Sequence, residues 1–91
     1  MEYQIIPIII VKLRYIIKNH MTEKKINQFI SHQLVKAREE KGLTQKKVQE
    51  DKIINQSALS KIENGVKNIS ASQLYILANY YNKPIEYFFN K

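Results

Sequence analysis

The stretch LTQKKVQEDKIINQSALSKIENG, residues 43–65, holds two short amphipathic runs with only a few residues between them. In the first run, Thr44 stands where a helix cap is expected, because its hydroxyl can accept a hydrogen bond from a backbone N–H of the next turn. Val48 then falls on the side that faces the core. This pattern predicts a short helix that ends near Asp51.

The second run has its own start and stop signals. Asn55 is the next good cap, and Leu59 and Ile62 form an apolar pair at i, i+3 spacing. Gly65 ends the run, since glycine readily adopts the left-handed backbone of a helix terminus. Two short helices with a tight connection predict a helix-turn-helix, in which one helix braces against the DNA backbone and the next lies in the major groove.

Apolar residues also recur at helical spacing on both sides of this stretch. Before it, residues 23–42 end at Gly42 and carry an apolar stripe, formed by Ile26, Phe29, Ile30, Leu34 and Ala37. After it, Ser70 and Gln73 match a capping box that precedes a second stripe, formed by Leu74, Leu77, Ala78 and Tyr81. Pro84 begins a short closing helix. The sequence therefore predicts an all-α fold of five helices.

Length and composition limit the function classes. The 91 residues are enough for one domain, and 15 Lys and Arg against 8 Asp and Glu give a net charge of +7. This surplus favours a polyanionic partner such as nucleic acid or an acidic membrane surface, although it is often only a solubility feature. Cysteine is absent, in agreement with a reducing cytoplasm, and His20 and His32 lack metal-ligand spacing. We therefore predict no metal, no cofactor and no enzymatic activity.

The N-terminal residues differ from the rest. The run IIPIIIVKLRYII, residues 5–17, is apolar and β-branched, but Pro7, Lys12 and Arg14 interrupt it well short of the roughly 18–20 apolar residues of a membrane span. A small-residue cleavage site is also missing, so we expect neither membrane insertion nor secretion. The β-branched content favours a strand or extended arm over a helix. We predict an apolar and basic arm over residues 1–21 and a helix-turn-helix domain over residues 22–91.

Three motifs carry a resemblance to a known family. These are GLTQ at residues 42–45, IENG at residues 62–65 and PIEYFF at residues 84–89. With the segments between them, they resemble the Xre and lambdoid Cro-type helix-turn-helix regulators from about Phe29 to Phe89. Two positions depart from the family pattern: Gln49 stands where alanine is usual against the third helix, and Ile53 stands where the turn generally has glycine. The resemblance implies a five-helix repressor-like domain.

The resemblance places base-reading residues at the start and on one outer face of the third helix, where Gln56, Ser57 and Lys61 fall. Glutamine can pair bidentately with adenine N6 and N7, and lysine can donate to guanine O6 and N7. Ser60 lies close to the same face as a secondary candidate. The alternative is that these side chains only solvate an amphipathic helix.

Other residues are expected at the DNA backbone. In the family, the side chain at the position of Gln45 and the nearby backbone N–H groups grip a phosphate, and the resemblance implies that Gln45 could also buttress Gln56 across the two helices. The resemblance also assigns the loop after the third helix to the backbone, so the expected phosphate contacts are Gln45, Lys46, Asn64, Lys67 and Asn68. At two further positions the family carries an ion pair between the first and third helices, which predicts a structural pair of Arg38 and Glu63.

A homodimer is expected because one recognition helix reads only a few base pairs, and two-fold pairing doubles the contacts. The interface candidates are Tyr81, Ile85, Tyr87, Phe88 and Phe89, although some of them must also complete the core of the monomer. The N-terminal arm is a second candidate, since an unpaired strand would gain by pairing across the dimer.

The predicted function is a cytoplasmic, sequence-specific DNA-binding regulator, in the first place a repressor that acts on its own or a neighbouring promoter. Several alternatives stay open: a controller protein of a restriction-modification system, an antitoxin whose arm binds a toxin, and an interaction module without DNA binding. A membrane-surface protein would use the apolar arm with Lys12, Arg14 and Lys18.

Overall fold

The computed structural model describes residues 22–90, which form four α-helices and one 3-10 helix. These are α2 (Glu23–Glu40), α3 (Gln45–Glu50), α4 (Gln56–Glu63), α5 (Ala71–Tyr80) and the 3-10 helix η1 (Ile85–Phe88). The described part of the chain contains no strand, so the predicted all-α fold is confirmed. The fifth predicted helix is the single turn η1. The predicted arm over residues 1–21 lies outside the described residues.

The helix starts follow the capping residues of the sequence. The hydroxyls of Thr22 and Thr44 accept hydrogen bonds from the third backbone N–H of α2 and α3, and the Asn55 side chain accepts two from the first turn of α4. At α5, Ser70 and Gln73 form the reciprocal capping box that the sequence predicted. Local chemistry therefore sets where each α-helix begins.

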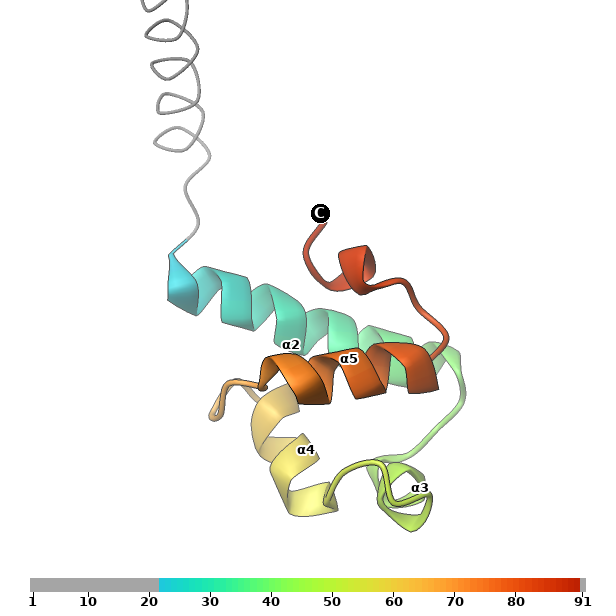
Figure 1. Ribbon diagram of the computed structural model, residues 1–91. Helices are drawn as coiled ribbons and strands as arrows, with labels where there is room; N and C mark the ends of the chain where they lie inside the picture. The colour runs from blue at the N-terminus through green and yellow to red at the C-terminus, as the bar shows by residue number, and fades with distance from the viewer. Residues whose placement is uncertain (1–21, 91) are drawn as a thin grey trace, which may run out of the picture.

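One core joins all five helices. Figure 1 shows α2 and α5 in the upper part of the domain, with α3 and α4 below them. The buried apolar side chains come from each of these elements and form one cluster: Ile30, Leu34, Ala37, Val48, Leu59, Ile62, Leu74, Leu77, Ala78, Tyr81 and Phe88. The single cluster holds the short helices α3 and α4, which are too short to be stable alone.

Two buried polar side chains on α2 add specific ties to this core. The hydroxyl of Ser31 donates to the backbone oxygen of Ile62 at 2.7 Å, at the end of α4. The side-chain amide of Gln33 donates to the backbone oxygen of Tyr87 at 3.0 Å, in η1. The bond from Gln33 serves a carbonyl near the end of η1, and the bond from Ser31 adds a second donor to the Ile62 carbonyl, which also accepts from the backbone N–H of Gly65. The sequence does not reveal these two contacts, because polar residues within an amphipathic helix are expected on its exposed face.

The turn between α3 and α4 contains no glycine, and Lys52 takes the left-handed backbone there with a φ of 60°. Ile53, which stands where the family generally has glycine, keeps a negative φ and packs against the core. A β-branched side chain is strongly disfavoured in the left-handed region, so the exposed Lys52 adopts it instead. The two short helices therefore keep their tight connection despite the departure in sequence.

The burial of the C-terminal aromatic residues corrects part of the dimer prediction. Tyr81 and Phe88 are completely buried among the residues of the monomer core. They are therefore not available to a second copy of the chain. Of the five interface candidates, Ile85 and Phe89 are exposed, and Tyr87 is half-buried. The sequence alone could not tell the inward ring of Phe88 from the outward ring of Phe89, because the two are adjacent in a single helical turn.

Within the described residues, no helix has the length and apolar character that crossing a membrane requires.

Two adjacent tyrosines differ in how their hydroxyls are satisfied. The hydroxyl of Tyr80 donates to Asp51 Oδ2 at 2.6 Å and so ties α5 to the end of α3. Desolvation and this hydrogen bond raise the pKa of Tyr80 to about 12. The hydroxyl of Tyr81 is buried and has no hydrogen-bond partner among residues 22–90. Burial of a hydroxyl without a hydrogen-bond partner is destabilising, and replacing tyrosine by phenylalanine removes the hydroxyl while the ring stays in place.

This contrast gives a stability prediction. Tyr81→Phe should raise the free energy of unfolding by about 1 kcal/mol, because it deletes a buried hydroxyl without a partner. Tyr80→Phe, the matched control, should lower it by about 1 kcal/mol or less, because it deletes a hydrogen bond at an exposed site. Urea unfolding followed by circular dichroism measures both. If Tyr81→Phe is the more destabilising of the two, its hydroxyl has a partner after all.

Candidate nucleic-acid interface

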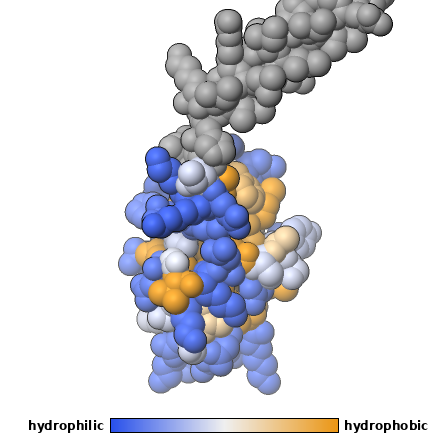
Figure 2. Space-filling view, turned by 90° about the vertical axis from the view of Figure 1, so that its left-hand side faces the viewer, coloured by the Kyte–Doolittle hydropathy of each residue, from blue (hydrophilic) through white to orange (hydrophobic). Residues whose placement is uncertain are grey.

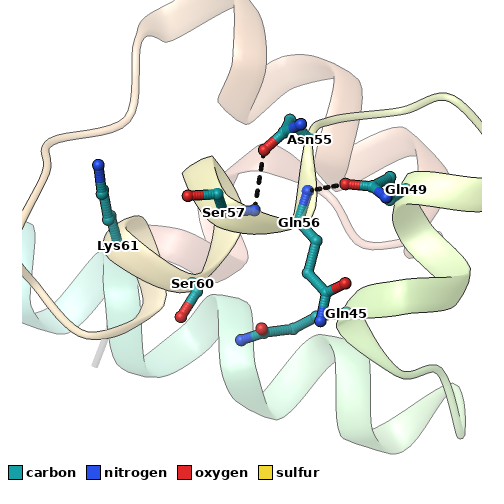
Figure 3. Close-up of a pocket in the computed structure, with 7 residues that line it drawn as sticks. All are labelled: Gln45, Gln49, Asn55, Gln56, Ser57, Ser60 and Lys61. Carbon is teal, nitrogen blue, oxygen red and sulfur yellow. Dashed lines mark hydrogen bonds between the residues drawn. The ribbon is translucent and has the colours of Figure 1, made fainter.

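An open cleft lies where α3 meets the start of α4 (Figure 3). Its lining side chains carry amide, hydroxyl and ammonium groups and no carboxylate, and they are Gln45, Gln49, Asn55, Gln56, Ser57, Ser60 and Lys61. In Figure 2 the lower end of the molecule, at which α3 and α4 lie in Figure 1, carries mostly hydrophilic side chains on the face shown. A surface of hydrogen-bonding and cationic groups suits the acceptor-rich edges and phosphates of DNA.

The four predicted base readers lie together on this cleft. Gln56, Ser57 and Lys61 are exposed, and Ser60 is half-buried. The opposite side of α4 carries Leu59 and Ile62, which are buried in the core. The helix therefore packs by its apolar side and presents its polar side to the outside, as the spacing predicted.

Gln45 is held by a partner within the protein. Its side-chain amide donates to Glu63 Oε1 at 2.8 Å, so this N–H is not free for a phosphate. The side chain of Gln56 extends toward Gln45 in the view of Figure 3, and both line the cleft. Gln45 thus joins α3 to the end of α4, a link that sequence analysis did not find.

Arg38 and Glu63 form a bidentate ion pair between α2 and α4. Arg38 Nε donates to Glu63 Oε2 at 2.8 Å, and Arg38 Nη2 donates to Glu63 Oε1 at 3.0 Å. A third N–H of the guanidinium donates to the backbone oxygen of Leu43 at 2.8 Å, just before α3. The hydrogen bond to Glu63 raises the pKa of Arg38. The planar guanidinium satisfies a carboxylate and a carbonyl together, which the ammonium of lysine cannot do with the same geometry.

The remaining phosphate candidates lie on two separate segments. Lys46 is exposed in the first turn of α3, whereas Lys67 and Asn68 are exposed in the loop between α4 and α5. Asn64 caps the end of α4, and its side-chain amide lies 3.4 Å from the hydroxyl of Ser60, to which it donates. These residues flank the outward, polar side of α4 in the sequence on both sides.

The charges of Lys46, Lys61 and Lys67 are available, in contrast with those of two other lysines of the domain. Lys47 pairs with Asp51 at 3.0 Å, and Lys83 pairs with Glu40 at 2.7 Å. Over residues 22–90, Lys46, Lys61 and Lys67 take part in no ion pair. An unpaired lysine keeps its full attraction for a phosphate.

Gln49 is a residue of the cleft whose contact the sequence did not reveal. Its Oε1 accepts a hydrogen bond from the backbone N–H of Gln56 at 2.7 Å. From the sequence alone, Gln49 is only a departure from the alanine of the family. A hydrogen bond between two helices depends on their packing, so no local pattern could have predicted it.

Two exposed apolar residues of α5 were also missed as interface candidates. Tyr75 and Ile76 are 63% and 47% exposed, comparable with the 52% of Phe89. No residue from Ala71 to Tyr80 is charged, although 25% of the chain is. Surfaces poor in charge and rich in aromatic and aliphatic groups are common at the centre of protein–protein interfaces.

Comparison with known proteins assigns the chain to a family. A helix-turn-helix family profile matches residues 34–88, which includes α3, α4 and the turn between them. Searches of curated proteins and of solved structures returned no match. The matched domain is a DNA-binding regulatory domain and not a catalytic one. With the bidentate pair, the capped helices and the polar cleft on α4, the profile match shows that the chain belongs to the Xre/Cro-type helix-turn-helix family of DNA-binding regulators.

Proposed function

We propose that the chain is a transcriptional repressor that binds DNA as a homodimer and reads the major groove with α4. The observation that carries this proposal is the polar cleft, in which the four side chains of α4 that face away from the core lie together. Such a regulator acts on the chromosome, so the proposal includes a cytoplasmic location. A protein partner bound through residues 1–21 remains part of the proposal, and these residues lie outside the described part of the chain.

The side chains of the cleft match the chemistry of base edges. The amide of Gln56 can accept from adenine N6 and donate to N7, and the ammonium of Lys61 can donate to guanine O6 and N7. Ser57 and Ser60 can donate or accept. Gln56 and Lys61 are five positions apart on the same helix, so they would reach different base pairs.

Contacts to phosphates would fix the helix in the groove. Lys46 on α3 and Lys67 after α4 carry charges that no acidic side chain of residues 22–90 neutralises. Asn64 and Asn68 can add neutral hydrogen bonds from the loop side. The net charge of +7 supports attraction to DNA over a longer range.

A second copy of the chain would supply the other half of the interface. The exposed apolar residues available for this contact are Phe89 and Ile85 at the C-terminal end, and Tyr75 and Ile76 on α5. An uncharged surface on a protein of +7 allows two copies to approach with less repulsion than any lysine-rich face. The two recognition helices would then read half-sites about one helical turn apart.

Selection of bound sequences from a random DNA library tests the proposal as a whole. Two symmetric half-sites about one helical turn apart are expected. A single half-site would contradict the dimer, and the absence of any enriched sequence would contradict sequence-specific binding.

The base-reading role of Gln56 gives a prediction about specificity. Gln56→Ala should weaken binding to the preferred site by roughly 1–3 kcal/mol and remove discrimination at one symmetric pair of positions. The fold should stay intact, since this side chain is exposed, and thermal unfolding checks this. A repeated library selection gives the readout. If discrimination falls evenly at all positions, Gln56 only positions the helix, and Ser57 and Lys61 become the leading readers.

The phosphate role of Lys67 gives a prediction about salt. Lys67→Ala should lower affinity equally on specific and random DNA and reduce the slope of log affinity against log salt by about one unit per protomer. Lys24→Ala is the matched control, because Lys24 is an exposed lysine in the first turn of α2. Fluorescence anisotropy at several salt concentrations measures both. An unchanged slope for Lys67→Ala would remove this residue from the phosphate contacts.

The dimer gives a prediction from two adjacent rings. Phe88→Glu should unfold the domain, because it places a carboxylate at a fully buried position. Phe89→Glu should leave the domain folded and shift it to the monomer, with much weaker binding to the two-half-site operator. Analytical ultracentrifugation at several concentrations, with circular dichroism, follows both properties. A folded, dimeric Phe89→Glu variant would move the interface to Tyr75 and Ile76 on α5.

A further inference from the structure

Gln49 links the end of α3 to the beginning of α4. Its side-chain Oε1 accepts a hydrogen bond from the backbone N–H of Gln56 at 2.7 Å, seven residues further along the chain. Figure 3 shows this bond next to the one that the N–H of Ser57 donates to Asn55. The residue that would read DNA is therefore held through its own backbone by a side chain of the preceding helix.

The whole first turn of α4 is satisfied inside the protein. The bond to Gln49 serves the first backbone N–H of the helix. The side chain of Asn55 accepts from the second and third, at 2.9 Å and 3.4 Å, and its carbonyl accepts from the fourth at 2.9 Å. The start of α4 thus offers no free backbone amide to a DNA phosphate. Its contribution to DNA binding has to come from side chains.

This arrangement depends on a residue that departs from the family pattern. The family generally carries alanine at the position of Gln49, and alanine has no oxygen that could accept the bond. The same connection lacks the usual glycine and bends at Lys52, which has a φ of 60°. The hydrogen bond from Gln56 to Gln49 therefore spans the segment that holds both departures from the family pattern, Gln49 and Ile53.

We propose that Gln49 is a positioning residue that determines base specificity by fixing the backbone from which the Gln56 side chain leaves α4. The proposal rests on the base-reading role of Gln56 proposed above. The direction of a side chain is set first by its own backbone, and the first turn of a helix frays easily. A bidentate contact with adenine needs the amide of Gln56 at a fixed distance and angle. Loss of the bond to Gln49 would therefore weaken discrimination at the base that Gln56 reads.

The first part of the test needs no DNA. Amide hydrogen exchange, measured by NMR, should show roughly fivefold less protection of the Gln56 N–H in Gln49→Ala than in the original protein, the factor that one ordinary hydrogen bond supplies. Gln49→Glu keeps an acceptor oxygen at this position and should retain the protection. The N–H of Leu59, which donates to the backbone oxygen of Asn55, serves as the internal reference and should change little. Equal protection of Gln56 in all three proteins would overturn the proposal.

The second part is a random-library selection with the same variants. Gln49→Ala should lose discrimination at the position pair that Gln56→Ala affects and keep it elsewhere, while binding random DNA as before. Gln49→Glu should keep the original preference with lower affinity on every sequence, because its charge repels phosphates. Gln28→Ala, which removes an exposed glutamine of α2, is the matched control and should change neither property.

A double variant separates positioning from other effects. If Gln49 acts through Gln56, Gln49→Ala should cause no further loss of discrimination at this position pair when Gln56 is already alanine. If Gln49→Ala keeps the original base preference, or loses discrimination at all positions, the positioning role of Gln49 is overturned and the proposed function is not affected. If the original protein selects no sequence at all, the proposed function fails as well, and the exchange data then show a hydrogen bond that is only structural.

Discussion

The position of every helix that meets DNA in this proposal depends on one buried carboxylate, that of Glu63. Only 3% of this side chain is exposed, and it accepts hydrogen bonds from Arg38 Nε, Arg38 Nη2 and Gln45 Nε2. A buried carboxylate that lost these partners would be an uncompensated charge, which costs several kcal/mol. Because Arg38 lies in the last turn of α2, Gln45 begins α3 and Glu63 ends α4, this one group fixes three helices relative to one another.

The two ends of α4 are held by different chemistry. At its end, Glu63 is anchored by charge, and at its start the side chains of Gln49 and Asn55 accept the first backbone N–H groups. Between these anchors the apolar side lies in the core through Leu59 and Ile62. The packing of α4 and the positions of its two ends are thus fixed without its outward side chains. The helix can therefore present these side chains from a rigid element, as accurate recognition requires.

The helices could be predicted from the sequence because their signals are local. Thr44, Asn55 and the Ser70–Gln73 pair cap helices through bonds within one turn, and apolar spacing alone gives the buried side. Contacts between helices could not be predicted in this way. The Arg38–Glu63 pair was accessible only through resemblance to a family, and the bonds of Gln45 and Gln49 have no sequence signal. Adjacent rings such as Phe88 and Phe89 were equally indistinguishable, since their burial depends on how η1 docks.

The polar residues around the cleft divide into two groups by their hydrogen bonds. Gln45, Gln49 and Glu63 are engaged with other groups of the protein. Gln56 and Lys61 are exposed on the outward face of α4, where we propose that they read bases. Substituting them loses little packing and should change the stability of the domain little. Changes in the second group can therefore alter which bases are preferred while the domain stays folded. Under the proposed function, changes at Gln45 or Glu63 alter how the whole outward face of α4 is presented, so their effect on binding should extend beyond any single base pair. A change at Gln49 should act through Gln56 alone.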